Sequence, residues 1–221
     1  MTFFDDQLLL KRLVHFSGPV EVHITVGLEN TSSEKARFQR ACQQHNGKSI
    51  WIELESGETV NQPMYGARLF APSQTQADEI KMLVDSFSKD FQVQRVKVEA
   101  GPNNKNIPQS AKDTVDEPED CYFEHHVALG LKAYTDFDDL KSKFKRYSGY
   151  LSKNALKTAP NSGEQIRFVT QRFSKIGQLE ADAKLKKLIA FAKQQSIDIV
   201  RIEREYNIFD SNLHLDHGWM S

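Results

Sequence analysis

The chain has 221 residues, of which 39% are hydrophobic, so it can bury a substantial core as one large domain or two small ones. Its 29 basic and 30 acidic residues nearly cancel, which excludes a global field that would attract nucleic acid or an anionic membrane. No apolar run approaches transmembrane length, the N-terminus is a poor signal peptide, and the two cysteines suit a reducing compartment. The composition predicts a soluble cytoplasmic protein.

The first hundred residues alternate between strand and helix patterns. The segment VEVHITVGL at 20–28 has the period of two that is typical of a strand with one buried face, with Glu21, His23 and Thr25 on the less apolar side. Helical spacing and turn residues delimit the remaining elements. In order, we expect a helix or extended arm over 5–16, a helix from 32 to 46, strands over 49–54 and 64–70, a helix over 75–91 and a strand over 93–100.

The second half repeats the first. The segment FEHHVALGL at 123–131 aligns with VEVHITVGL, so that Glu124 matches Glu21 and His126 matches His23 at an offset of 103 residues. The strand VRIE at 200–203 matches VKVE at 96–99 at a similar offset, and an internal duplication explains this pattern. The other expected elements are strands over 150–156 and 165–173 and two helices whose apolar faces carry Leu140, Phe144 and Tyr147, and Leu185, Leu188, Ile189 and Ala192.

The element order predicts an α+β fold of two tandem ferredoxin-like βαββαβ repeats, with antiparallel sheets that helices cover on one face and leave open on the other. Residues 1–100 form the first expected domain with its N-terminal arm, and residues 121–221 the second. Residues 101–120 contain three prolines and almost no large apolar side chains, so they predict a flexible linker. The segment 206–221 has no counterpart and is apolar enough to pack onto the body as a tail.

Polar residues recur on the expected open faces. One interpretation is a solvated sheet face whose charges pair across strands. The other is that the two faces pack together and line a cleft for a small anionic or phosphate-bearing ligand, because unpaired charges there would be costly. The candidate ligand-binding residues are Glu21, Thr25, Arg68, Lys97, Glu99, Glu124, Arg172, Arg201 and Glu203, and the candidate catalytic residues are His23 and His126.

The run His23-Ile24-Thr25-Val26 resembles the H-x-T-hydrophobic motif of two-histidine phosphoesterases. The resemblance implies that His23 and His126 act as general acid and base on a phosphodiester or cyclic phosphate, for which the near-neutral pKa of histidine is suited. Ala128 stands where the second hydroxyl residue of the motif would be.

A second resemblance covers most of residues 122–219. The strings YFEHH, SKNALK, RFVTQR, VRIEREY and DSNLHLDHGW look like a set of uncharacterised bacterial proteins with this layout. This resemblance implies the arrangement of the elements and no activity.

Other candidates have simpler interpretations. His214, Asp216 and His217 could ligate a metal, but their spacing is not distinctive, and a packed tail is the favoured interpretation. His125 alternates toward the helices and is expected to be a core residue. The sequence thus indicates no metal site, no cofactor and no nucleic-acid partner. It predicts a binding protein for a small anionic ligand, with a phosphoesterase or a non-catalytic regulatory or interaction module as alternatives, and leaves the oligomeric state open.

Overall fold

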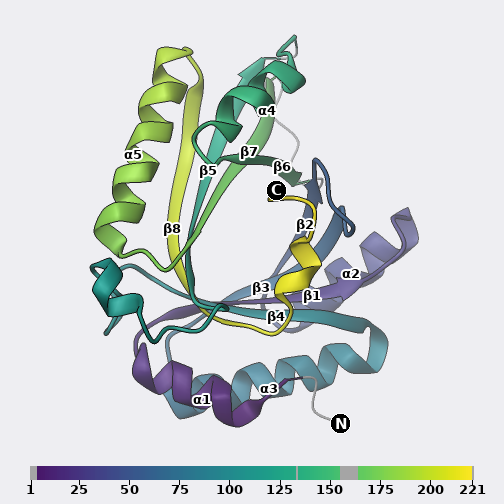
Figure 1. Cartoon of the computed structure of the whole chain (residues 1–221). Helices are drawn as coiled ribbons and strands as arrows, with labels where there is room; N and C mark the ends of the chain where they lie inside the picture. Colours follow the sequence, from purple (N-terminus) through teal and green to yellow (C-terminus); the bar gives the residue numbers. More distant parts are fainter. Residues whose placement is uncertain (1–3, 133, 155–163, 221) are drawn as a thin grey trace.

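The computed structural model describes residues 4–132, 134–154 and 164–220. Within these residues the eight strands are all antiparallel to their neighbours, and α-helices cover the outside (Figure 1). The strands are β1 (Val20–Gly27), β2 (Lys48–Leu54), β3 (Asn61–Leu69), β4 (Gln92–Ala100), β5 (Tyr122–Lys132), β6 (Tyr150–Asn154), β7 (Glu164–Ser174) and β8 (Asp198–Asp210). The helices are α1 (Asp6–His15), α2 (Ser32–Gln44), α3 (Ser73–Asp90), α4 (Phe137–Lys145) and α5 (Gln178–Gln194), with 3₁₀ turns η1 (Ala111–Thr114) and η2 (Leu213–Asp216).

The strands form one closed barrel in the order β1-β3-β2-β6-β7-β5-β8-β4, with β4 returning to β1. The prediction of two tandem ferredoxin-like repeats, each with an open sheet face, is therefore wrong. Two pairings close the barrel: β2 with β6, where Ile52 lies opposite Asn154, and β4 with β8, where Lys97 lies opposite Asp210. An exposed strand edge carries unpaired backbone groups, and these pairings remove the outer edges of both halves.

Strand β8 makes the second closure possible through its length. It has 13 residues, whereas the sequence pattern indicated a strand only over 200–203. Its first part pairs with β5, and its last part, from Tyr206 to Asp210, pairs with β4 of the other half. The beginning of the expected C-terminal tail is thus a strand of the barrel. The strand predicted over 150–156 corresponds to β6, which ends at Asn154. Residues 155 and 156 lie outside the described residues.

Two apolar cores lie between the barrel and its helices. The larger core contains Leu9 and Leu13 of α1 and Phe87 of α3, and it also receives Phe209 from the end of β8. The smaller core lies under α4 and α5 and includes Phe144. In Figure 1 α1 and α3 cover one end of the molecule, and α4 and α5 cover the other. With the apolar side chains of β1 and β4 facing these cores, the polar side chains of the same strands face the barrel interior.

The first helix begins at a local capping signal. The Asp5 side chain accepts hydrogen bonds from the backbone N–H groups of Gln7 (2.9 Å) and Leu8 (3.0 Å), which satisfies two of the free donors at a helix start. The expectation of a helix or an extended arm over 5–16 thus resolves to a helix. None of the described helices is both long and apolar enough to cross a membrane.

Residues 101–120, which composition predicts to be a flexible linker, make several contacts in the structure. The Asn104 side chain donates to the carbonyl oxygens of Phe16 (3.0 Å) and Pro19 (2.9 Å), and Ile107 is buried in the larger core. Farther along, the backbone N–H of Gln178 donates to the carbonyl of Pro108 at 2.8 Å.

Candidate functional site

The barrel encloses a cavity of about 480 Å³. Eight-stranded barrels have interiors just wide enough for packed side chains or one small ligand, and this volume lies in the range of small-molecule sites. Among the site residues predicted from the sequence, Arg68 is the exception: it lies outside the cavity, mostly exposed, and contacts Glu21 at 2.9 Å. The predicted residues that line the cavity are Glu21, His23, Thr25, Lys97, Glu99, Glu124, His126, Arg172, Arg201 and Glu203.

These residues come together because the barrel closes. On β1 and β5 every second side chain faces inward, and strand register then places inward residues of neighbouring strands side by side. His23 lies opposite Lys97 on β4, and Glu124 lies opposite Arg172 on β7. The face that the sequence indicated as open is therefore the lining of the barrel.

Glu124 is the centre of one group of buried charges. It is 1% exposed, and its two carboxylate oxygens contact different cations. One oxygen forms an ion pair with Lys97, and the other lies 2.8 Å from Nη2 of Arg172. Burial opposes ionisation of Glu124, but Arg172 and Lys97 outweigh it and hold the pKa of this carboxyl well below its usual range. Lys97 also lies 2.5 Å from Oε1 of Glu99.

A second group is organised by Arg95, which sequence analysis did not select. Its guanidinium forms an ion pair with Asp210, from the end of β8, and lies 3.0 Å from Asp216 of η2. Asp216 also lies 2.6 Å from Arg172, so it links this group to the one around Glu124. Because Arg95 precedes Lys97 and Glu99 at a spacing of two, strand alternation could have placed it on the same face.

His23 and Glu99 form a close pair. Nε2 of His23 lies 3.0 Å from Glu99 and 3.9 Å from Glu21. Burial disfavours protonation of His23, but the two carboxylates outweigh it and raise the pKa of this histidine above 6.5. Nδ1 of His23 is buried and has no hydrogen-bond partner among the described residues.

His126 occupies the matching position in the second half. Its Nδ1 lies 3.0 Å from the hydroxyl of Thr170 on β7, and its Nε2 lies 3.5 Å from Glu124 and 3.6 Å from Glu205. Burial, together with the charge of Glu99, raises the pKa of Glu205 well above its usual range. The pattern of β8 could have identified Glu205, which stands two residues after Glu203.

Glu99, His126 and Glu205 offer three possible ligand atoms that all lie within 4.8 Å of one another. This spacing is compatible with a metal ion. However, the Lys97 ammonium already contacts Glu99, and a metal cation would have to compete with it. These three residues therefore belong to the charge network of the cavity and do not form a built metal centre.

The cavity lining combines apolar and charged side chains. In the closed order of strands, β2 stands four places from β8, so the two strands face each other across the barrel. The apolar lining residues are Ile50, Ile52, Leu54, Met64, Phe168 and Trp219, and on β2, β3 and β6 they alternate with the polar residues Lys48, Ser49, Gln62, Ser152 and Asn154. The charged lining comprises five Lys and Arg residues, Lys48, Arg95, Lys97, Arg172 and Arg201, and six Asp and Glu residues, Glu21, Glu99, Glu124, Glu203, Glu205 and Asp216.

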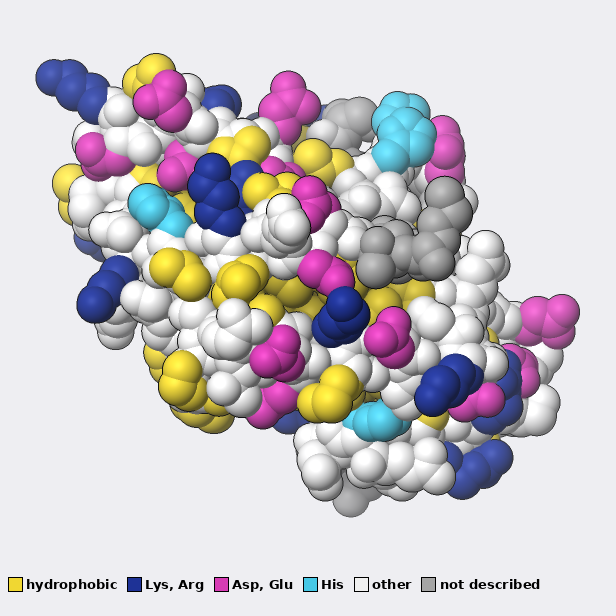
Figure 2. All heavy atoms as spheres, turned by 90° about the horizontal axis from the view of Figure 1, so that it is seen from below, with side chains coloured by type: hydrophobic (Ala, Val, Ile, Leu, Met, Phe, Trp, Pro, Cys, Tyr) yellow, Lys and Arg dark blue, Asp and Glu magenta, His cyan; other side chains and the backbone are white. Residues whose placement is uncertain are grey.

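Two observations outside the cavity agree with this arrangement. His125, which the alternation directs toward the helices, is 1% exposed and lies 3.4 Å from Gln171 in the core. The outer face seen in Figure 2 carries charges of both signs, interspersed with apolar side chains.

Comparison with known proteins adds little. No family model matches the chain, and no curated protein matches it. Among solved structures, the acetolactate synthase small subunit from Thermotoga maritima is similar with 13% identity and a TM-score of 0.31, covering 86% of this chain and 96% of that one. Chlorite dismutase from Candidatus Nitrospira defluvii is similar with 10% identity and a TM-score of 0.29, covering 93% and 97%. A putative monooxygenase from Fusobacterium nucleatum has 10% identity and a TM-score of 0.28, covering 87% and 92%. Likenesses this low support no inference about this chain.

Proposed function

We propose that the protein binds a small molecule inside the barrel, and that this molecule has an apolar body and a cationic, amine-type head. The observation that carries the proposal is the placement of Glu205, whose ion-pair contact among the described residues is His126 at 3.6 Å, across the barrel from the apolar side chains of β2. Apolar lining with a few convergent polar groups is the usual form of a small-molecule site. The apolar side chains would contact the body of the ligand, and the Glu205 carboxylate would receive its head.

Arg95 and Lys97, two buried cations of the cavity, already have carboxylate partners. Arg95 contacts Asp210 and Asp216, and Lys97 contacts Glu99 and Glu124. An anionic head would have to displace one of these carboxylates or lie beside it, and like charges at close range are costly in a low-dielectric interior. The anionic or phosphate-bearing ligand expected from the sequence therefore receives less support than a cation.

The environment of Glu205 also favours a positively charged ligand head. Its pKa is raised by burial and by the neighbouring charge of Glu99, so the ionised form is disfavoured when no cation is present. A cationic head placed beside Glu205 would supply the missing positive charge and allow the carboxyl to ionise. Ligand binding should therefore release a proton when the pH lies below the raised pKa of Glu205.

A matched pair of probes tests the proposal: an arylalkylamine and the carboxylate of the same length. A ligand that binds only the native state raises the melting temperature, so we expect the amine to raise Tm in a thermal-shift assay and the carboxylate to leave it unchanged. Replacement of Glu205 by Gln should weaken binding of the amine by about tenfold or more, since it removes a charge-assisted hydrogen bond. Glu180→Gln, at an exposed position of α5, is the matched control and should bind normally.

A cavity-filling variant locates the ligand. Ile52→Trp adds volume at an apolar lining position of β2 and should abolish the response to the amine while the chain remains folded by circular dichroism. Stabilisation by the carboxylate or by a phosphate ester, without stabilisation by the amine, would refute the cationic ligand and favour the anionic one. An unchanged response in Ile52→Trp would refute binding inside the barrel.

One arrangement supports a second candidate function, catalysis by the histidine pair. His23 and His126 line one cavity, and hydroxyls of Thr25 and Thr170 line it with them. The hydroxyl of Thr170, 3.0 Å from His126, would take the place of the hydroxyl residue that Ala128 replaces in the motif. If the protein is a two-histidine phosphoesterase, His23→Ala and His126→Ala should each abolish turnover of a 2′,3′-cyclic nucleotide. Turnover that survives either substitution would exclude this function.

A further inference from the structure

Two neighbouring histidines mark the C-terminal 3₁₀ turn: His214 lies on η2, and His217 directly follows it. A 3₁₀-helix has about three residues per turn, so side chains three positions apart lie one above the other. His214 and His217 have this spacing, and their rings stack with centroids 4.7 Å apart and an interplanar angle of 20°. Both are exposed, so their ring nitrogens are accessible from solvent.

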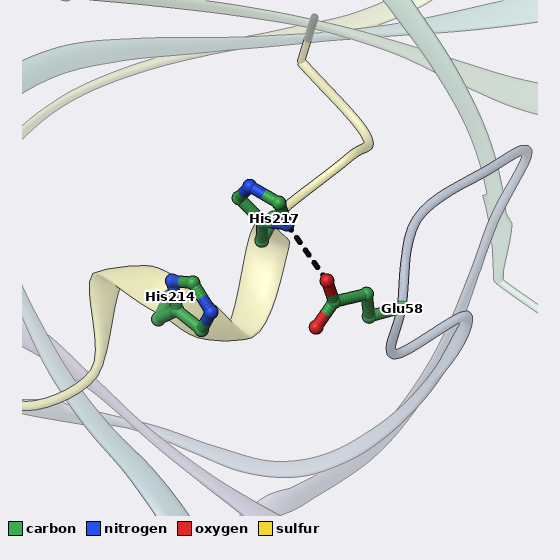
Figure 3. A group of neighbouring side chains, drawn as sticks. All are labelled: Glu58, His214 and His217. Atoms are coloured by element: carbon green, nitrogen blue, oxygen red, sulfur yellow. Dashed lines mark hydrogen bonds and ion pairs between the residues drawn. The ribbon is translucent and has the colours of Figure 1, made fainter.

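A carboxylate from a distant part of the chain reaches the same place. The turn between β2 and β3 packs against η2: the backbone N–H of Glu58 donates to the carbonyl of His217 at 3.1 Å, and the Ser56 hydroxyl donates to the carbonyl of Gly218 at 3.3 Å. These contacts bring Oε1 of Glu58 to 2.9 Å from Nδ1 of His217. Figure 3 shows the three side chains gathered between the 3₁₀ turn and the β2–β3 turn.

We propose that Glu58, His214 and His217 bind a Zn²⁺ ion at the mouth of the barrel. Two imidazoles and one carboxylate are a ligand set that zinc uses in proteins, and imidazole favours zinc over the oxygen-seeking Mg²⁺ and Ca²⁺. The three possible ligand atoms already lie within 4.8 Å of one another. Tetrahedral zinc with bonds of about 2.0–2.1 Å needs donor atoms about 3.4 Å apart, which exposed side chains can reach by rotation.

This cluster differs from the group of Glu99, His126 and Glu205 inside the barrel in one important respect. Inside, Lys97 contacts Glu99 and competes with a metal, whereas among the described residues the ion-pair partner of Glu58 is His217 itself. Asp216, which the sequence grouped with these histidines, faces the other way and contacts Arg95 and Arg172. The metal set therefore takes its carboxylate from the β2–β3 turn.

A zinc ion at this site would join the segment after β8 to the β2–β3 turn. The segment that follows β8 forms part of the cavity wall, because Asp216 and Trp219 line the cavity and the Trp219 indole N–H donates to the carbonyl of Leu151 at 3.1 Å. A zinc ion held by Glu58 and the two histidines would fasten this segment to the β2–β3 turn. The ion would thus hold the end of the chain against the barrel mouth.

The test is titration of the full chain, without a polyhistidine tag, with Zn²⁺ in a calorimeter. We expect one Zn²⁺ per chain and no comparable response to Mg²⁺. His217→Ala and Glu58→Gln should each weaken zinc binding by about tenfold or more, since each removes one of three ligands. His15→Ala, which removes an exposed histidine on α1, is the matched control and should bind as the unchanged protein does.

A second readout reports on the fastened segment. Zn²⁺ should raise Tm of the unchanged protein and of His15→Ala, and should raise it much less in His217→Ala. Both altered residues of the cluster are exposed, so the variants should fold, which circular dichroism verifies. Absence of zinc binding to the unchanged protein would overturn the proposal. So would a zinc affinity in Glu58→Gln and His217→Ala equal to that of the unchanged protein.

Discussion

Glu124→Gln is the substitution that most directly tests the buried charge network. The change keeps the shape of the side chain and removes its negative charge at a position that is 1% exposed. Removal of one partner of a buried ion pair typically costs about 3–5 kcal/mol, because the remaining charge loses its compensation. Here each cation retains another carboxylate: Lys97 keeps Glu99 at 2.5 Å, and Arg172 keeps Asp216 at 2.6 Å. We therefore expect Glu124→Gln to lower the free energy of unfolding by about 3 kcal/mol, near the lower end of this range.

The pH dependence follows from the direction of the pKa shift. The pKa of Glu124 in the folded protein lies well below the ordinary value of 4.5, so ionisation of this group stabilises the fold at pH values above that ordinary value. This contribution is lost as the pH falls through the folded-state pKa. The difference in stability between the unchanged protein and Glu124→Gln should accordingly be largest near pH 7 and should shrink as the pH is lowered below about 4.5.

Urea denaturation at a series of pH values measures both effects. Glu34→Gln is the matched control, because Glu34 forms an ion pair with Arg37 at 2.8 Å on the surface of α2. Exposed pairs contribute about 0–1 kcal/mol, so the control should differ little from the unchanged protein. If Glu124→Gln unfolds with the same midpoint as the control, or if its deficit does not depend on pH, the network does not stabilise the fold as described.

Two further predictions concern packing. Residues 101–120 should resist limited proteolysis under native conditions, because Ile107 is buried in the larger core; rapid cleavage there with intact halves would support the flexible linker instead. Gly47→Ala should lower stability by about 1–3 kcal/mol, since a Cβ at this position would lie 1.9 Å from the buried ring of Tyr65. Gly101→Ala is its control, with the nearest atom at 3.6 Å, and equal melting temperatures for the two variants would contradict this account.

Local patterns in the sequence were sufficient to place several polar side chains on one strand face. Period-two alternation depends only on the geometry of an extended chain, so His23 on β1 and Glu124 on β5 could be assigned to the same kind of face without knowledge of the fold. Helical spacing likewise identified the faces that carry Phe144 and Leu188, which are buried in the smaller core. These assignments need no information about distant residues.

The closure of the barrel could not be read from the same patterns. Whether the edge strands β2 and β4 stay open depends on partners about 100 residues away, and on how far β8 continues beyond Glu203. Strand length and register are decided by which hydrogen bonds and side-chain contacts the folded chain can form, so propensity and alternation do not specify them. The open faces expected from two separate sheets became a shared interior.

The charged groups of the cavity depend on this closure. Arg95 lies on β4, Asp210 ends β8, and Asp216 lies on η2, so these residues meet only when β8 crosses to the first half and the segment after it returns to the barrel. Likewise, Glu58 reaches the histidines of η2 because the β2–β3 turn packs against that segment. The sequence by itself determined which side chains share a strand face, because that is a property of the local backbone. Only the tertiary structure decided which faces meet, because that depends on pairing between segments far apart in the chain.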